Sequence, residues 1–204
     1  MSEIKRSLET LEIIGGALCL DFVNTINSRQ YLEHEYLSSY AELVNWGTKI
    51  GILSTEQNHR LQKQAKQDEK TAELALKKAI EYRELFFRLF ARLAKGSEPN
   101  KQDMADFTKI YGEALSSAQL TREEERFSPR WKLDQTLEAL LWPIIYSAGE
   151  ILFSKEVNQV KECPSCGWLF LDTSKNQTRR WCSMNTCGAR DKMRRYHGKL
   201  RAKS

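Results

Sequence analysis

Long apolar runs are missing from this sequence of 204 residues. No stretch approaches the roughly 18 apolar residues that a membrane-spanning helix requires. The first six residues, Met-Ser-Glu-Ile-Lys-Arg, lack the long apolar stretch of a signal peptide. We therefore expect a cytoplasmic protein without a membrane partner.

Histidine is scarce as well. His34, His59 and His197 are the three histidines of the chain, and they lie far apart in the sequence. No pairing of a nucleophile with a base stands out, nor does a pair of carboxylates, and no glycine-rich loop suited to a phosphate is present. We therefore do not expect an enzyme.

Glycine and proline are absent from residues 56–95, and the composition of this segment favours helix throughout. Forty residues exceed the usual length of a helix in a globular protein. We therefore expect a break near Gln67, with Asp68 capping a second, longer helix that forms the spine of the domain.

Two other segments complete the expected helical domain. Residues 114–132 show little helical periodicity, and segments 118–120 and 126–132, on either side of the charged tip 122–125, predict a small β-hairpin. Residues 134–153 return to a helical pattern, with a kink expected at Pro143 because proline cannot donate a hydrogen bond to the preceding turn. The predicted fold class is mainly α: a multihelical N-terminal domain with a minor β-hairpin, followed by the small cysteine-bearing unit described below.

Polar residues interrupt apolar helical faces at two places. Asp21, Asn24 and Thr25 lie within the apolar segment 18–26, and Arg83 lies within the apolar stripe of the long helix. Buried polar groups need partners. Two alternatives remain open for the first three: they cap neighbouring backbone, or they line a pocket for a small molecule. Arg83 either extends along its stem to solvent or binds a buried carboxylate ligand.

Four of the five cysteines lie close together near the C-terminus. Cys163 and Cys166 are separated by two residues, Cys182 and Cys187 by four, and this spacing is typical of a closed tetrahedral zinc site. Disulfides are the alternative, but nothing else in the chain indicates an oxidising compartment. Four thiolates fill the coordination shell of one zinc ion, so we expect a structural rather than a catalytic metal.

The segments around the cysteines predict a small finger. Gly167 follows the first pair and can supply the positive φ that a tight knuckle needs. Residues 168–171 and 178–181 are expected to pair as a hairpin held at its open end by zinc. After Cys187, apolar residues at helical spacing begin at Ala189 and predict a helix. Together these features indicate a treble-clef-like zinc finger of one β-hairpin and one helix.

Positive charge is concentrated in this finger. Residues 155–204 contain twelve Lys and Arg against four Asp and Glu, a formal charge of +8, whereas the whole chain carries +5, so the rest carries −3. A basic module attached to a mildly acidic domain is typical of nucleic-acid binding, and DNA is the expected partner. The residues expected to contact DNA are Lys175, Arg179, Arg180, Arg190, Lys192, Arg194, Arg195 and Lys199.

Other partners remain open. RNA is an alternative if Trp168, Phe170 or Trp181 is exposed and stacks on bases, whereas these aromatics otherwise fill the small core of the finger. The finger could also build a protein interface or a homodimer.

Cys163-Pro-Ser-Cys166-Gly-Trp-Leu-Phe-Leu-Asp, Arg-Arg-Trp-Cys182-Ser-Met and Cys187-Gly-Ala-Arg-Asp-Lys resemble the CGNR-type zinc finger. Leu18-Cys-Leu-Asp-Phe-Val-Asn-Thr, after Gly15-Gly16, resembles the opening motif of the helical ABATE domain that precedes such fingers. The resemblance implies a helical domain over residues 1–155, a finger over 156–204, and a stress-induced transcription regulator whose helical domain senses a small-molecule effector or mediates assembly. The sequence departs from the family at Ala189, where an asparagine is usual.

Overall fold

The computed structural model describes residues 7–30 and 34–201, with side chains up to residue 198. Seven α-helices and two small antiparallel hairpins form this part of the chain. The helices are α1 (Leu18–Val23), α2 (Tyr40–Lys49), α3 (Thr55–Gln67), α4 (Glu69–Ala94), α5 (Lys101–Ser116), α6 (Leu141–Leu152) and α7 (Ala189–Arg201). The strands are β1 (Gln119–Glu123), β2 (Arg126–Arg130), β3 (Val160–Glu162) and β4 (Leu169–Leu171). The expected fold class is confirmed.

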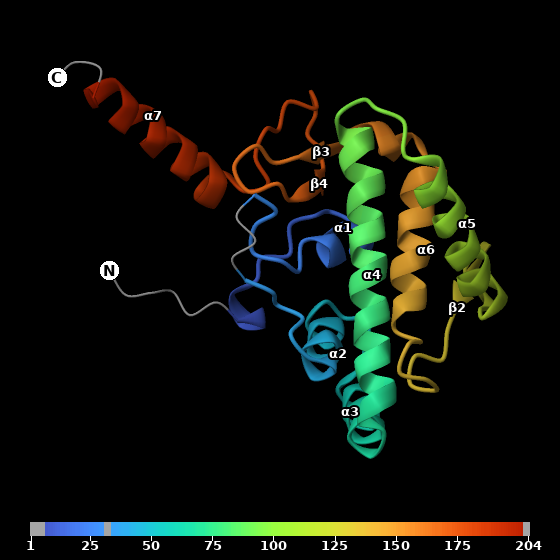
Figure 1. Cartoon of the computed structure of the whole chain (residues 1–204). Coiled ribbons are helices and arrows are strands. Elements are labelled where there is room, and N and C mark those ends of the chain that lie inside the picture. Colours follow the sequence, from blue (N-terminus) through green and yellow to red (C-terminus); the bar gives the residue numbers. More distant parts are fainter. Residues whose placement is uncertain (1–6, 31–33, 202–204) are drawn as a thin grey trace.

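Helix α4 runs through the centre of the molecule (Figure 1) and packs against α1, α2, α3, α5 and both strands β3 and β4. The break ahead of it lies at Asp68, as the sequence predicts, and the Asp68 side chain accepts a hydrogen bond from the backbone N–H of Thr71. Ser54 and Gln57 form the reciprocal capping box that starts α3. Hydrogen bonds from capping side chains therefore fix where α3 and α4 begin.

The predicted kink at Pro143 is wrong, because α6 begins at Leu141 and not near residue 134. Pro143 is thus the third residue of α6. The first N–H groups of a helix have no partner within it, so a proline in the first turn removes no hydrogen bond and bends nothing. The residues ahead of α6 instead form turns in which the Leu137 carbonyl accepts a hydrogen bond from the Tyr40 hydroxyl at 2.7 Å.

Arg83 does not extend to solvent, so that expectation is wrong. The residue is only 2% exposed, and its guanidinium binds the Glu35 carboxylate with two hydrogen bonds of 2.7 Å. Its Nε donates to Glu84 at 2.9 Å. A planar guanidinium matches a carboxylate in this two-bond arrangement, so carboxylates of the chain itself hold Arg83 inside.

The hydrophobic core continues from the helices into the C-terminal part of the chain. All three residues of β4 are buried, and they belong to the same cluster as α1, α4 and the four clustered cysteines. Helix α7 differs, because it projects away from the body (Figure 1) and all of its described residues except Asp191 are exposed. Within the described residues, no helix is both long and apolar enough to cross a bilayer.

Candidate metal centre

The four clustered cysteines converge on one point. The Sγ atoms of Cys163, Cys166, Cys182 and Cys187 all lie within 4.8 Å of one another, and all four residues are buried. The Sγ atoms of Cys166 and Cys182 are 3.5 Å apart, and those of Cys182 and Cys187 are 3.6 Å apart. Four sulfurs at about 2.3 Å from a tetrahedral zinc ion are separated by roughly 3.8 Å, so the spacing fits this ion.

Disulfide bonds do not account for the cluster. All five cysteines are free, and the sulfur separations far exceed the roughly 2.05 Å of an S–S bond. The neighbouring thiols, Cys166 first, lower the pKa of Cys163, whereas contact with Cys163 raises the pKa values of Cys166 and Cys182. Four thiolates at these distances repel one another, and a bound cation offsets this repulsion. The four cysteines form a single structural zinc site.

A tight knuckle positions the first two ligands. The N–H of Gly167 donates to the Cys163 carbonyl and the N–H of Cys163 donates to the Trp168 carbonyl, each at 2.8 Å. Gly167 has φ of 76°, the positive value expected from the sequence. A Cβ at this residue would lie 2.7 Å from the Cβ of Arg29, so glycine is needed for space as well as for conformation.

The predicted strand pairing of the finger is wrong. Strand β4 pairs with β3, with Lys161 opposite Phe170, whereas residues 178–181 form no strand. The knuckle is therefore the turn of the hairpin, and the zinc site lies at its closed end. The segment 160–162 is too short and too polar to show an alternating pattern, which is why the sequence did not indicate its pairing.

Asp172 organises the segment between the two cysteine pairs. It is fully buried, forms an ion pair with Lys161, and accepts hydrogen bonds from Ser174 and from the backbone N–H of Arg179 at 2.9 Å. Burial alone would raise the pKa of Asp172, but the hydrogen bonds from Lys161 and Ser174 outweigh it and lower this pKa to about 2. The hydrogen bonds of Asp172 therefore hold this segment in place, whereas the sequence predicts that strand pairing does so.

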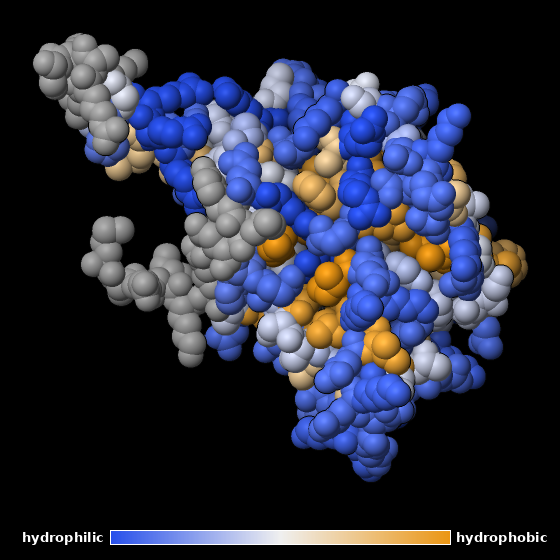
Figure 2. Space-filling model, in the orientation of Figure 1, coloured by the Kyte–Doolittle hydropathy of each residue, from blue (hydrophilic) through white to orange (hydrophobic). Residues whose placement is uncertain are grey.

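The third and fourth ligands lead directly into α7. Cys187 lies in the short π-helical turn Met184–Gly188, and α7 begins at the next residue. The zinc site therefore fixes the start of α7, whereas residues 192–198 of this helix are exposed among the residues that the structure describes. Hydrophilic residues predominate on the surface of α7 (Figure 2).

The residues expected to contact DNA fall into two groups. Arg190, Lys192, Arg194 and Arg195 are exposed on α7, and the side chain of Lys199 lies outside the described residues. Lys175, Arg179 and Arg180 belong to the segment between the cysteine pairs.

The members of the second group differ in their surroundings. Lys175 and Arg180 are exposed, whereas Arg179 is half-buried. Its guanidinium donates to the carbonyls of Trp181 and Cys182 and lies 4.4 Å from the centroid of the Phe170 ring. Its contacts in the structure are therefore within the finger itself.

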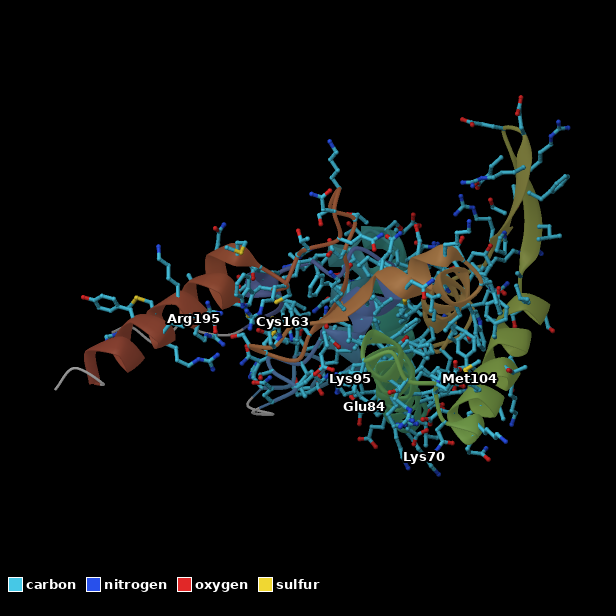
Figure 3. All side chains as sticks on the ribbon, turned by 90° about the horizontal axis from the view of Figure 1, so that it is seen from above. Lys70, Glu84, Lys95, Met104, Cys163 and Arg195 are labelled. Carbon is cyan, nitrogen blue, oxygen red and sulfur yellow. The ribbon has the colours of Figure 1, made fainter. Side chains whose placement is uncertain are left out.

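Asp191 is the one buried residue on the described part of α7, and it is not among the residues predicted from the sequence. One of its carboxylate oxygens lies 2.8 Å from Nη2 of Arg194, and the other lies 2.9 Å from Nε of Arg195. Residues three and four apart are neighbours on a helix. The spacing of Asp191, Arg194 and Arg195 in the sequence could therefore have indicated these ion pairs. Asp191 holds the two guanidinium groups side by side (Arg195 is labelled in Figure 3).

The possible pocket residues all contact the protein itself. Asp21 accepts a hydrogen bond from the N–H of Gly15 at 2.7 Å, and Thr25 donates to the Phe22 carbonyl at 2.7 Å. Asn24 donates to the Leu169 carbonyl at 2.8 Å and accepts from its N–H at 3.0 Å.

A cavity of about 410 Å³ lies between α2, α3 and α4, and Asp21, Asn24, Thr25 and Arg83 do not line it. The small-molecule pocket at these four residues stays a prediction.

The aromatic residues of the finger are largely enclosed. Trp168 is 7% exposed and Phe170 is fully buried, and the Trp168 indole donates to the Ile26 carbonyl at 2.7 Å. Trp181 is half-buried. Trp168 and Phe170 are therefore not available to stack on bases.

The fold and the site together define a class of protein: a helical protein that ends in a structural zinc finger. Comparison with known families agrees, since residues 16–155 match the ABATE family, described as "putative stress-induced transcription regulator", and residues 159–199 match the CGNR zinc finger. The chain belongs to the ABATE family. Neither description names a catalytic activity, and no curated protein matches the chain.

Proposed function

We propose that this protein is a cytoplasmic, DNA-binding transcription regulator whose basic arm, defined as helix α7, contacts the double helix. The observation that carries the proposal is the combination of a zinc-fixed start, an exposed helix of 13 residues, and exposed cations on both sides of it. The family description supports regulation of transcription. An α-helix fits the major groove of DNA, and arginine and lysine neutralise phosphates beside it.

The apolar positions of the basic arm fit the same partner. Met193 is 58% exposed and Tyr196 is 59% exposed. At 100° per residue, these two lie between Arg190 and Arg194 on one flank of the helix and Lys192 and Arg195 on the other. Apolar side chains in the major groove contact the methyl groups of thymine. Exposed apolar residues between cations are therefore compatible with a helix that binds bases along its centre and phosphates along its edges.

Salt dependence of DNA affinity tests the proposal. If the basic arm and the finger neutralise five to eight phosphates, the logarithm of the association constant falls with the logarithm of salt at a slope of roughly −4.5 to −7. Fluorescence anisotropy with a random-sequence duplex measures this slope. A slope near zero would contradict DNA binding.

A pair of charge-matched variants locates the contact. Arg194→Glu with Arg195→Glu should abolish DNA binding, whereas Lys70→Glu with Lys77→Glu, which changes the net charge equally but on α4, should leave most of it. Figure 3 shows Arg195 and Lys70 on different parts of the molecule. Equal losses in both variants would mean that net charge, and not the basic arm, attracts DNA.

A second candidate function is protein interaction through the finger, and the exposure of Met193 and Tyr196 favours it. In that case Met193→Ser with Tyr196→Ser should disperse an assembly seen by light scattering while DNA binding is absent from the wild type. Strong, salt-sensitive DNA binding by the wild type excludes this alternative as the main function.

A further inference from the structure

The cavity of about 410 Å³ lies where α2, α3 and the first half of α4 meet. This is the end of α4 that is remote from strands β3 and β4 (Figure 1). Each of the three helices contributes one alanine to the lining, Ala41, Ala65 and Ala72, and these short side chains leave room that larger ones would fill. Sites for small molecules usually measure roughly 300–1,000 Å³, so the cavity is large enough for one.

The inner wall of the cavity is apolar. Ala72 is 6% exposed, Ala65 and Leu76 are half-buried, and Tyr40 is buried beside them. Apolar surface is visible along the lower half of α4 (Figure 2). An apolar group of a ligand would be removed from water against this wall, which favours binding.

The rim of the cavity carries charges of both signs. Glu69 and Glu73 lie one helical turn apart on α4, both are exposed, and neither forms an ion pair within the described residues. Like charges at this spacing destabilise a helix, so an ammonium group bound beside both carboxylates would be favourable. Lys66 on α3 lines the same cavity and is likewise exposed, and it could bind an anionic group.

The start of α2 also favours an anionic group. The N-cap Ser39 and the first two residues of α2, Tyr40 and Ala41, line the cavity. The Ser39 hydroxyl accepts the N–H of Glu42 at 3.2 Å, whereas the N–H groups of Tyr40 and Ala41 have no acceptor within the helix. The N-terminus of a helix attracts a carboxylate through such N–H groups and through the helix dipole.

We propose that this cavity binds a free amino acid with an apolar side chain. The ammonium group of the ligand contacts Glu69 and Glu73, its carboxylate contacts Lys66 and the first N–H groups of α2, and its side chain lies against Ala72 and Leu76. A simple amine or a simple acid would meet only one of these two sets of charged groups. Binding at this site does not depend on DNA binding by the basic arm.

Nuclear magnetic resonance titration of the zinc-loaded full chain tests the proposal. The probes are L-leucine and L-phenylalanine, followed by the amide and the N-acetyl derivative of whichever binds more tightly. The amide lacks the carboxylate and the N-acetyl derivative lacks the ammonium group. Each derivative should therefore bind at least about tenfold more weakly than the parent amino acid, because each loses charged hydrogen bonds. No spectral shift with either amino acid up to its solubility limit, or equal binding of a derivative, would overturn the proposal.

Two variants and a matched control locate the ligand. Glu69→Gln with Glu73→Gln should weaken binding of the amino acid about tenfold and leave the N-acetyl derivative as weak as before, since that derivative has no ammonium group to lose. Ala65→Trp should fill the cavity and abolish binding with unchanged helical circular dichroism. The control, Glu81→Gln with Glu98→Gln, removes two exposed carboxylates that do not line the cavity and should bind as the wild type does. An equal loss in the control, or full binding by Ala65→Trp, would place the ligand elsewhere and overturn the proposal.

Discussion

Asn24 joins the helical part of the chain to the cysteine-bearing part through both ends of its amide. The residue is 1% exposed, and its side chain pairs with the N–H and the C=O of Leu169, 145 positions away. This is the pattern by which one strand binds the edge of another. On the edge of β4 that faces away from β3, Asn24 therefore pairs with Leu169, and the Gly15 carbonyl accepts from the N–H of Leu171 at 2.8 Å.

Asn24→Ala should lower the free energy of unfolding by about 2–6 kcal/mol, because both backbone groups of Leu169 would be buried without a partner at about 1–3 kcal/mol each. Urea denaturation of the zinc-loaded protein measures this loss. The matched control is Asn176→Ala, at an exposed position of the finger, which should change stability by no more than about 0.5 kcal/mol. Similar losses in the two variants would contradict a bridging role for Asn24.

The partners of Arg83 outside α4, like those of Asn24, lie far away in the sequence and could not be predicted from it. The residues of this ion cluster come from three segments, because Glu84 also pairs with Arg29, whose backbone N–H donates to the Cys166 carbonyl at 2.8 Å. Burial alone would raise the pKa of Glu84, but Arg29 and Arg83 outweigh it and lower that pKa. A helical pattern shows that Arg83 faces the core, but it cannot show which distant carboxylates meet it there.

Arg83→Met should destabilise the protein by about 2–4 kcal/mol, because it leaves Glu35 without its cation; the loss stays below that of a fully enclosed pair, since this carboxylate is partly exposed. Arg83→Lys keeps the charge but loses the two-bond geometry, and should cost less. Thermal unfolding of both variants checks this order. If Arg83→Met were as stable as the wild type, the ion cluster would have no structural role.

At the scale of elements, the zinc knuckle was the most predictable part of the chain. The spacing of the cysteines and the glycine after Cys166 are local signals, and the structure confirms both the cluster and the positive φ of Gly167. The pairing of β3 with β4 was not predictable, because the three residues of β3 carry no alternating pattern. The start of α6 was missed since a helical pattern in residues 134–140 also fits turns, and Pro143 suits a first turn.

Gly167→Ala should weaken zinc binding, because alanine is strained at positive φ and its Cβ would collide with Arg29. A loss of about 1–3 kcal/mol corresponds to roughly 5- to 150-fold in affinity. Competition with a chromophoric zinc chelator measures it. The control is Gly198→Ala on α7, where the space around the Cβ is open, and zinc affinity should not change. Equal affinity in the Gly167 variant and the wild type would contradict the role assigned to the knuckle.

At the scale of the whole molecule, the zinc site and the helices share one hydrophobic core. The carbonyls of the knuckle accept hydrogen bonds from the segment after α1, where Ser28, Arg29 and Gln30 contact Cys166 or Pro164. The metal is thus surrounded by the helical part of the chain and not by the finger alone. Zinc binding and helical stability should therefore be coupled.

Calorimetry checks this coupling. The zinc-loaded protein should unfold in one transition, and chelation should lower the unfolding temperature of the whole chain, because a ligand that binds only the folded state stabilises it. Cys166→Ser should reproduce the effect of chelation. A helical transition that stays at its original temperature after chelation would show two independent units.

The central claim is that one zinc ion on four cysteines fixes a basic helix that binds DNA. The most direct test is a titration of zinc into metal-free protein in the presence of labelled random-sequence duplex at low salt, followed by anisotropy. The claim predicts that DNA binding rises with zinc and saturates at one equivalent per chain. Full binding before zinc is added, or no binding after saturation, would contradict it.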